Sequence, residues 1–579
     1  MGHILPAVAL LSAQPVQRLV HLSVVDLIII AFYFVLVLAI GFYLKGRSNT
    51  SEDYFMAGRE MTAWIAGLSF LSANLGSLEL MGWAGSAYQY GILATHWYWI
   101  GAIPAMLFLA LVMMPFYYIS KTHSVPGYLK LRFGEPSRAL SAVSFAFMTV
   151  LMSGINMYSM ALVMKVVLGW DIHFSIWVSS LTVAVYVALG GLRGAIFNEV
   201  LQFILIWAGA LLIPILGLIE AGGWAKLKVQ IAANAGEAYT HLWGTLGSSA
   251  NNPMGMHWTG IVFGLAAVIS MGYWTTDFLV VQRVLSAKDM RAAKMAPIIG
   301  AAFKMMVPFI VILPGLLALA VLRDPSGNMI LLHGEDWVRL HGGHSYNEVL
   351  PLMLARYLGP GLLGLGVTAL VAGFMSGMAG NVSAFSTVWT YDIYEALFHK
   401  NATDQDKVKM GRWSTIVGIF VSIGAAYIAK GKPSIMDYVQ ELFSFFIAPL
   451  FGTVLIGMLW KRATAAGGFW GLFAGTASSI GMYTWVKLDP SAVKYVAFSM
   501  AAQVQAQNMF RALWCALIGA AVTIIVSLLT KPKPDAELAN LVYGLTPIPK
   551  TEQVPLLHRP LFWAAVVAGM FVILQIIFW

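Results

Sequence analysis

Charged residues are scarce in this chain of 579 amino acids. Lys, Arg, Asp and Glu together make up 11% of the sequence, whereas a soluble domain contains roughly 25%. This deficit excludes a soluble globular protein, a disordered chain and a nucleic-acid-binding protein. Cysteine is almost absent as well. Cys515 is the single cysteine, which excludes an intrachain disulfide and a cysteine metal site.

The chain contains many long apolar runs, and 59% of its residues are hydrophobic. A membrane crossing needs about 20 consecutive apolar residues, and lipid tolerates only helices or closed barrels. None of the runs alternates as a strand would. The sequence therefore indicates an all-α polytopic membrane protein with about fourteen transmembrane helices. They are predicted at residues 26–45, 62–90, 97–119, 139–168, 174–192, 196–220, 258–282, 296–321, 360–396, 413–430, 434–459, 465–486, 508–530 and 560–578.

The positions of Lys and Arg give the predicted orientation. Most of the 35 Lys and Arg residues fall in connections that share one side if the N-terminus lies outside. Cytoplasmic loops carry the excess of positive charge, so we expect both termini outside the cytoplasm and a plasma (cell inner) membrane location. The apolar stretch Ile4–Leu11 has almost no positive charge before it, which makes it a poor signal peptide, and we expect it to be retained.

Two of the predicted helices are interrupted by small and polar residues. The segment Trp64–Tyr90 has Ser72, Asn74, Gly76 and Ser77 at its centre. The segment Gly260–Gln282 contains Ser270, Gly272, Thr275, Thr276 and Asp277. Interrupted helices in the two halves of a chain are typical of a transporter binding site. The alternative is that the small residues only permit close helix packing.

Several ionisable residues lie within the predicted spans, among them Glu79, Asp277 and Lys304, while Glu199 lies near a helix start. Each such charge costs several kcal/mol at the bilayer centre unless it is paired or hydrated, which favours a functional role. The alternative is a buried Glu79–Lys304 pair that only stiffens the helix bundle.

A series of short motifs carries a family resemblance. The motifs are Ser51–Arg59 (SEDYFMAGR), Ser72–Ser77 (SANLGS), Gly190–Ala195 (GGLRGA), Asn198–Gln202 (NEVLQ), Tyr273–Trp274 with Gln282–Arg283, and Thr387–Tyr394 (TVWTYDIY). In this order and at these helix positions, they resemble the sodium/solute symporter family, specifically its sodium/glucose cotransporter-like branch. The resemblance extends from about Val25 to Trp579.

The resemblance implies a LeuT-like core of two inverted five-helix repeats. The implied organisation is an N-terminal segment with one extra helix (1–61), a first repeat (62–220), an outer loop (221–257), a second repeat (258–459, with an outer loop at 322–358) and three C-terminal helices (460–579, with a loop at 531–559). A sodium ion is the implied coupling ion, with a small solute and the lipid bilayer as the other partners. The sequence gives no indication of an oligomeric state.

The resemblance also implies a sodium site made from carbonyls of Ser72, Leu75 and Gly373 and the hydroxyl of Ser376. Many members of the family have a second hydroxyl residue where this chain has Gly377. A water or the Ser72 hydroxyl could replace that ligand, and proton coupling stays open. The alternative for Ser376 is a bond back to its own helix.

An acidic residue near the ion exit of the family corresponds to Glu199. The alternative for Glu199 is a solvated carboxylate at a helix start, where the positive end of the helix dipole stabilises it.

A sugar site needs fixed donors and acceptors, because buried polar groups left unpaired are costly. The resemblance implies that such a site consists of Asn74, Glu79, Tyr98, Ser270, Tyr273, Trp274, Lys304 and Gln440, with Tyr273 as the inner gate. Glu79, Tyr98 and Ser270 differ from the residues common in relatives. The alternative for Tyr98 and Trp97 is an interfacial aromatic belt. The expected function is sodium-coupled symport of a neutral sugar or polyol by alternating access.

Other functions are less well supported by the residues. A sodium- or proton-coupled symporter of a small organic acid, amino acid or vitamin is the main alternative. A membrane enzyme would need a catalytic cluster, and the best candidate, His333, His341 and His344 in the outer loop, has a zinc-like spacing but is typical of solvated loop histidines. The glycines Gly359, Gly361 and Gly364 follow no strand, which excludes a dinucleotide site. Nothing resembles the filter ring of a channel.

Overall fold

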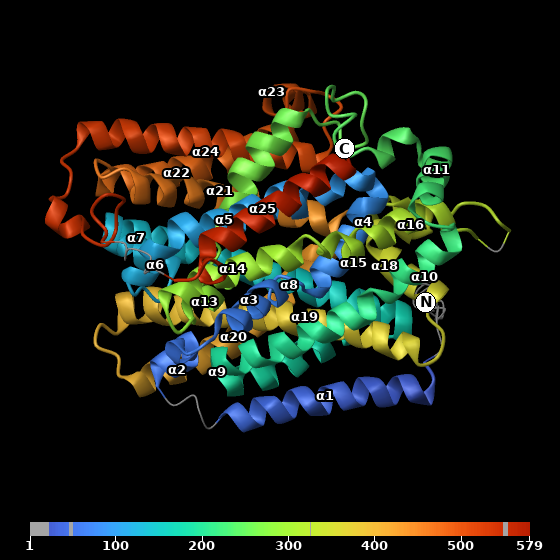
Figure 1. The fold of residues 1–579 in the computed structure, drawn as a ribbon, viewed down its shortest axis with the longest axis horizontal. Coiled ribbons are helices and arrows are strands. Elements are labelled where there is room, and N and C mark those ends of the chain that lie inside the picture. Colours follow the sequence, from blue (N-terminus) through green and yellow to red (C-terminus); the bar gives the residue numbers. More distant parts are fainter. Residues whose placement is uncertain (1–21, 46–49, 325, 548–553) are drawn as a thin grey trace, which may run out of the picture.

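The computed structural model describes residues 22–45, 50–324, 326–547 and 554–579. Most helices run along the long axis of the molecule, with α1 at the lower edge against α9 (Figure 1). Within the described residues, nine helices are long and apolar enough to cross a membrane, or up to eleven if each of two bent pairs forms one span. The polytopic helical architecture is thus confirmed, while the count of fourteen stays a prediction. The Ile4–Leu11 stretch lies outside the described residues.

The first half of the chain contains helices that precede the second interruption. They are α1 (Val24–Lys45), α2 (Ser51–Met56), η1 (Ala57–Arg59), α3 (Ala63–Ser72), α4 (Ser77–Tyr90), η2 (Gly91–Trp97), η3 (Tyr98–Ala102), α5 (Ile103–Phe108), η4 (Leu109–Met113), α6 (Met114–Ile119), α7 (Val125–Phe133), α8 (Glu135–Leu168), α9 (Ile172–Ala210), α10 (Leu212–Ala221), α11 (Trp224–Ala235) and η5 (Glu237–Thr240).

The second half begins with a π-helical segment and continues to the C-terminus. Its elements are η6 (Gly260–Ser270), α12 (Met271–Thr276), α13 (Phe278–Leu285), α14 (Met290–Lys304), α15 (Val307–Val311), α16 (Leu313–Val321), β1 (Leu332–His333), α17 (Glu335–His341), β2 (His344–Ser345), η7 (Tyr346–Glu348), α18 (Val349–Tyr357), α19 (Leu362–Val388), η8 (Trp389–Phe398), α20 (Asp404–Lys430), α21 (Ile435–Leu459), α22 (Ala465–Leu488), η9 (Pro490–Ala492), α23 (Val493–Val496), α24 (Val504–Leu529), η10 (Asp535–Leu538), η11 (Leu556–His558) and α25 (Pro560–Ile577).

Both predicted interruptions are present. The first separates α3 from α4, and Gly76 at the start of α4 has extended backbone. A Cβ on Gly76 would lie 2.7 Å from Asn156 Oδ1, so a larger residue here would displace the Asn156 side chain. The second separates α12 from α13, which are bent by 49°. Asp277 lies at this bend and accepts a hydrogen bond from Leu279 N at 2.9 Å, so it caps α13.

A third break was not predicted. The range 296–321, expected as one helix, is bent by 46° between α14 and the segment Val307–Val321. Pro308 lies at the start of α15, and proline cannot donate a backbone hydrogen bond to the preceding turn. The break makes Lys304 the last residue of α14.

The expected separation between 174–192 and 196–220 is present. Helix α9 (Ile172–Ala210) consists of two helical stretches that meet at Gly191, whose backbone (φ 55°, ψ −159°) is not helical. A Cβ on Gly191 would lie 2.7 Å from the Tyr54 ring, so glycine lets α2 pack closely against α9. Glu199 lies in the stretch of α9 that follows this break, and the alternative that it is a solvated helix-start carboxylate is wrong, because it is fully buried.

The predicted outer loops contain structure of their own. Helix α11 lies in the 221–257 loop, and the 322–358 loop contains α17, α18 and two short strands. Strand β1 pairs in parallel with β2, with Leu332 opposite His344. Two-residue strands have too few residues for the alternating pattern that identifies a strand in a sequence.

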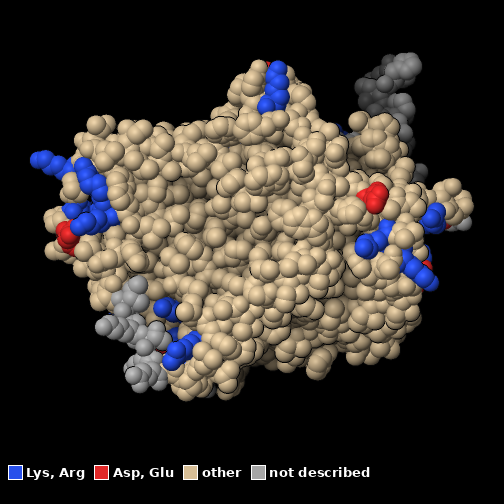
Figure 2. Space-filling view, turned by 45° about the horizontal axis from the view of Figure 1, so that its top comes forward, with Lys and Arg blue, Asp and Glu red and all other residues tan. Residues whose placement is uncertain are grey.

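The molecular surface has the charge distribution of a membrane protein. On the face in Figure 2, most Lys, Arg, Asp and Glu side chains gather toward the two ends, and the broad surface between them is uncharged. Large apolar side chains are exposed along the helices, for example Phe32 on α1 and Ile219 on α10. An uncharged band of this kind suits the hydrocarbon layer of a bilayer.

Candidate functional site

A small cavity lies between the two broken helices. Its volume is about 40 Å³, and its walls include all eight residues predicted for the substrate, namely Asn74, Glu79, Tyr98, Ser270, Tyr273, Trp274, Lys304 and Gln440. These residues come from segments that are up to 366 positions apart in the chain, from residue 74 to residue 440. The fold brings them together, and their role in substrate binding stays a prediction.

Asn74 is the centre of the polar network in this cavity. The Lys304 ammonium donates to Asn74 Oδ1. The Asn74 amide nitrogen donates to the Tyr273 hydroxyl at 2.8 Å and to Glu79 Oε1 at 3.4 Å. The Tyr98 hydroxyl donates to Glu79 Oε2 at 2.5 Å. Asn74 thus lies between Glu79 and Lys304, so the direct pair considered from the sequence is replaced by an amide bridge.

Aromatic rings form much of the remaining wall. The Lys304 ammonium lies 4.6 Å from the centre of the Tyr98 ring and 4.9 Å from that of Trp274. Trp83 lies 5.0 Å from Trp97, centre to centre. Tyr98 is 2% exposed and Trp97 is 7% exposed, so the interpretation of these two residues as an interfacial belt is wrong. Flat apolar faces beside hydrogen-bonding groups suit a polyhydroxy ring.

Sequence reasoning left four residues of this wall out of the site, Trp83, Trp97, Ile269 and Phe443. Two of them had a usable signal, because helical residues three or four positions apart share a face. Trp83 follows Glu79 by one turn, and Phe443 follows Gln440 by one turn.

Two polar atoms around the cavity have no protein partner. They are Gln440 Oε1 and Trp97 Nε1, both buried. An acceptor and a donor left unpaired in this way each cost about 1–3 kcal/mol, and a solute with hydroxyl groups would satisfy both.

A second cavity of about 20 Å³ adjoins the first. The two share four wall residues, Asn74, Glu79, Tyr273 and Phe443. The Tyr273 and Phe443 rings contact each other at 4.9 Å, centre to centre. Asn156, Asp277 and Asn381 line only the second cavity. Tyr273 and Phe443 therefore lie where a gate between two compartments would lie.

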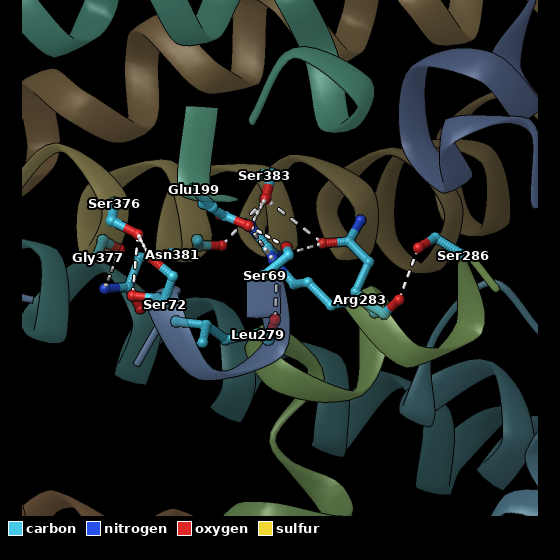
Figure 3. Close-up of polar contacts among 12 residues, drawn as sticks. Ser69, Ser72, Glu199, Leu279, Arg283, Ser286, Ser376, Gly377, Asn381 and Ser383 are labelled. Carbon is cyan, nitrogen blue, oxygen red and sulfur yellow. Dashed lines mark hydrogen bonds and ion pairs between the residues drawn. The ribbon is translucent and has the colours of Figure 1, made fainter. Parts of the chain in front are cut away.

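The residues predicted for sodium also come together (Figure 3). The Ser376 hydroxyl lies 3.0 Å from the Ser72 hydroxyl and donates to the Ser72 carbonyl at 2.9 Å. The backbone of Gly373 lies close to Leu75, since a Cβ there would be 3.0 Å from the Leu75 carbonyl oxygen. The alternative that Ser376 bonds back to its own helix is therefore wrong. Hydroxyls and carbonyls of this kind are hard ligands that suit sodium; binding of the ion here stays a prediction.

Gly377 lies against the unwound segment. A Cβ at this position would be 3.0 Å from Gly76 Cα and 3.3 Å from Asn156 Oδ1. Glycine therefore permits the close approach of α19 to the first break. The hydroxyl that lies close enough to Ser376 to replace the ligand missing at Gly377 is that of Ser72.

Glu199 forms a buried ion pair next to Ser69, which lies one turn before Ser72 on α3. Its Oε1 atom lies 2.6 Å from the Arg283 guanidinium, and neither side chain is exposed. The Ser69 hydroxyl also donates to Glu199, and the guanidinium donates to Ser383 Oγ at 3.2 Å. Figure 3 shows that these side chains converge from α3, α9, α13 and α19. We refer to Ser69, Glu199, Arg283 and Ser383 as the clasp, because they join the ends of both broken helices to two scaffold helices.

Outside the predicted spans, the Ser51–Arg59 motif forms a charged contact. Glu52 accepts hydrogen bonds from Arg59 Nε at 2.7 Å and pairs with His123 Nε2 at 3.1 Å. The hydrogen bond with His123, followed by that with Arg59, lowers the pKa of Glu52 to about 2. The Glu52 carboxylate therefore stays ionised at physiological pH.

The outer-loop histidines have separate surroundings. The rings of His333 and His341 both pack on Trp337, at 3.7 Å and 4.7 Å. His344 Nδ1 contacts Glu348 Oε2 at 2.5 Å. In the described part of the chain, no group of three or more His, Cys, Asp or Glu side chains could hold a metal ion.

Together, the helical membrane architecture and the cavity between two broken helices define a class of protein: the secondary transporter. The family description "sodium:solute symporter family" matches residues 54–475. The chain belongs to this family.

The similarity to individual relatives supports the same family assignment. The chain is 28% identical to sodium/glucose cotransporter 4 of Mus musculus, over 90% of this chain and 77% of the relative. It is 29% identical to the sodium/myo-inositol cotransporter of Canis lupus familiaris, over 78% of this chain and 66% of the relative. A solved structure of a Na⁺-coupled sialic acid symporter superimposes with a TM-score of 0.71 at 22% identity, covering 88% of this chain and 99% of the symporter. The chain therefore has the fold of that symporter.

Proposed function

We propose that this protein is a sodium-coupled symporter of a neutral sugar or polyol. The observation that carries the proposal is the cavity, in which hydrogen-bonding groups and aromatic faces from both broken helices surround one space. Gln440 Oε1 and Trp97 Nε1, which have no protein partner, are available to hydrogen-bond with a hydroxylated solute. The names of the relatives, which include glucose and myo-inositol cotransporters, support the same class of substrate.

Transport requires the cavity to widen. A volume of about 40 Å³ is close to the space of a single water, roughly 30 Å³, whereas small-molecule pockets measure about 300–1,000 Å³. Sodium between α19 and the first break would hold Ser72 and Ser376 together and favour the form that admits solute, since a ligand shifts an equilibrium by its differential affinity. Movement of Tyr273 away from Phe443 would then join the two cavities, and opening of the clasp would release the ion past Glu199.

The finer architecture is part of this proposal. The segments 62–220 and 258–459 form the two inverted repeats of a LeuT-like core, and the two observed breaks occupy corresponding places in them. The protein is a multi-pass transporter of the plasma membrane with both termini outside the cytoplasm. It carries out no catalysis.

Uptake by the purified protein in proteoliposomes tests this function. Labelled monosaccharides, polyols and small acids are offered with an inward sodium gradient, with equal sodium on both sides, and with an inward proton gradient. We expect one or more sugars or polyols to accumulate only with the sodium gradient. Accumulation driven by protons alone, or uptake confined to acids, would contradict the proposal.

A further inference from the structure

A buried asparagine in the middle of a scaffold helix lies against the first break. Asn156 belongs to α8 and is 3% exposed. It lines the second cavity together with Gly76 and Gly377, and neither the predicted sodium residues nor the clasp include it. A buried amide has donors and an acceptor to satisfy, so the partners of Asn156 indicate its role.

Asn156 caps the start of α4 from outside that helix. The first backbone N–H groups of an α-helix have no carbonyl partner within the helix, and the side chain of the preceding residue usually accepts from one of them. That residue is Gly76, which makes no such bond. Leu78 N instead donates to Asn156 Oδ1 at 3.3 Å, and the Ser77 hydroxyl donates to the Asn156 backbone carbonyl at 3.3 Å. The start of α4 is therefore held by α8.

The same amide fills the space between the first break and α19. A Cβ on Gly76 would lie 2.7 Å from Asn156 Oδ1, and a Cβ on Gly377 would lie 3.3 Å from Oδ1 and 3.4 Å from Nδ2. The Cβ on Gly76 would also lie 3.5 Å from Gly377 Cα. The two glycines and the amide thus pack against one another, and a side chain at position 377 fits only if its neighbours move.

Each of these glycines is next in sequence to a predicted sodium residue. Gly76 follows Leu75, and Gly377 follows Ser376. Consecutive Cα atoms are only about 3.8 Å apart, so the separation of the two glycines constrains the separation of Leu75 and Ser376. A sodium ion needs oxygens from the first break and from α19 at the same time, and Asn156 lies where that separation is determined.

We propose that Asn156 is a positioning residue for sodium. Its amide holds Gly76 and Gly377 at the separation that lets the oxygens of the first break and of α19 surround one ion. Asn156 and Gly377 are a matched pair, because the amide from α8 occupies space that a side chain at position 377 would need. The inference rests on the proposed function, since the ion that it concerns is the coupling ion of that function.

Equilibrium binding of ²²Na⁺ to the purified full-length protein in lipid nanodiscs tests this role. We expect Asn156→Ala to raise the sodium dissociation constant by about tenfold, because the cap of α4 and the contact with Gly377 are both lost. Asn508→Ala is the matched control and should not change it. Asn508 is also a buried asparagine, but it donates to the Asp437 carbonyl at 3.0 Å and lines neither cavity. An unchanged dissociation constant in Asn156→Ala would overturn the proposal.

Gly377→Ser separates positioning from a general loss of stability. In the wild type the new side chain meets the Asn156 amide, so we expect sodium binding to weaken. In the Asn156→Ala background the amide is gone, so the same substitution should weaken binding less. A double-mutant cycle measures this coupling. Equal effects of Gly377→Ser in the two backgrounds would overturn the proposal.

Asn156→Leu keeps the test decisive if Asn156→Ala fails to fold. This variant preserves the approximate size of the side chain and removes its hydrogen bonds, and it too should weaken sodium binding. If Ser376→Ala weakens sodium binding and no Asn156 variant does, the sodium site holds and this inference fails. A wild type that binds no sodium would overturn the proposed coupling ion and this inference together.

Discussion

At the scale of single residues, the positions of the site residues could be predicted and their pairings could not. The eight residues that the family resemblance implied all lie in the cavity wall, because each lies at a recognisable place in a broken or neighbouring helix. The bridging of Lys304 and Glu79 by Asn74 could not be predicted, because it depends on how α4 and α14 pack around the first break. The same holds for Glu199, whose partner Arg283 lies 84 positions away in the chain.

Lys304→Ala tests the network around Asn74. The substitution removes a charge-assisted donor from the cavity, which is worth about 1.5–3 kcal/mol. We expect the KM for the transported solute to rise by about 10- to 100-fold. Lys432→Ala is the control, because Lys432 pairs with Glu441 away from the cavity. An unchanged KM in Lys304→Ala would remove Lys304 from the solute site.

Ser376→Ala tests the sodium residues. Loss of one hydroxyl ligand should raise the sodium concentration for half-maximal uptake by about tenfold, with little change in the KM for solute at saturating sodium. Ser422→Ala is the matched control, since the buried Ser422 hydroxyl bonds back to the Gly418 carbonyl at 2.7 Å. If both variants have the sodium dependence of the wild type, the ion binds elsewhere.

At the scale of elements, the two breaks could be predicted because small and polar residues gather at both. The bend after Lys304 could not. Pro308 gave a signal for the bend, but proline is also tolerated in membrane helices. The boundary predicted near Gly191 is present, since the backbone of Gly191 is not helical and packs closely against Tyr54. The short strands of the outer loop depend on contacts that no local pattern specifies.

The clasp makes a prediction about opening. Its ion pair joins α13 to α9, and a buried ion pair broken by removal of one partner costs roughly 3–5 kcal/mol. We expect Glu199→Gln to shift the protein toward the form in which the second cavity is open. Met152 lines the second cavity. Because Cys515 is the single cysteine, labelling of Met152→Cys in a Cys515→Ser background reports that opening, and it should become faster in Glu199→Gln.

Two further variants make the clasp experiment decisive. Ser69→Ala removes only one hydrogen bond to Glu199 and should accelerate labelling more modestly. Glu395→Gln, which breaks a contact with Lys407 at the chain surface, should have no effect. Slower or unchanged labelling in both clasp variants would contradict the role of the clasp in closure.

The outer loop should respond to pH through His344. The hydrogen bond with Glu348 raises the pKa of His344 above its usual value near 6.5. A raised pKa means that the contact stabilises the loop fully below the unfolded value and that this stabilisation is lost as the pH rises through the folded value. We expect hydrogen exchange at residues 344–348 to accelerate on going from pH 6 to pH 9, after correction for intrinsic exchange. The same acceleration in His344→Gln would rule out this cause.

At the scale of the whole molecule, the charge distribution predicts the orientation. If the predicted fourteen spans are present, with the basic connections inside, both termini lie outside the cytoplasm. A protease-cleavable tag at either terminus should be removed by external protease in intact cells or right-side-out vesicles. Protection of either tag until the membrane is opened would contradict the predicted topology.

The most direct measurement of the central claim is the coupling of two fluxes. Uptake of ²²Na⁺ and of the labelled sugar or polyol is followed in the same proteoliposomes with wild type and Ser376→Ala. The account predicts that each solute accelerates the other in a fixed ratio in the wild type, and that Ser376→Ala reduces both at limiting sodium. Sugar uptake that proceeds equally without sodium, or sodium flux that ignores the sugar, would contradict it.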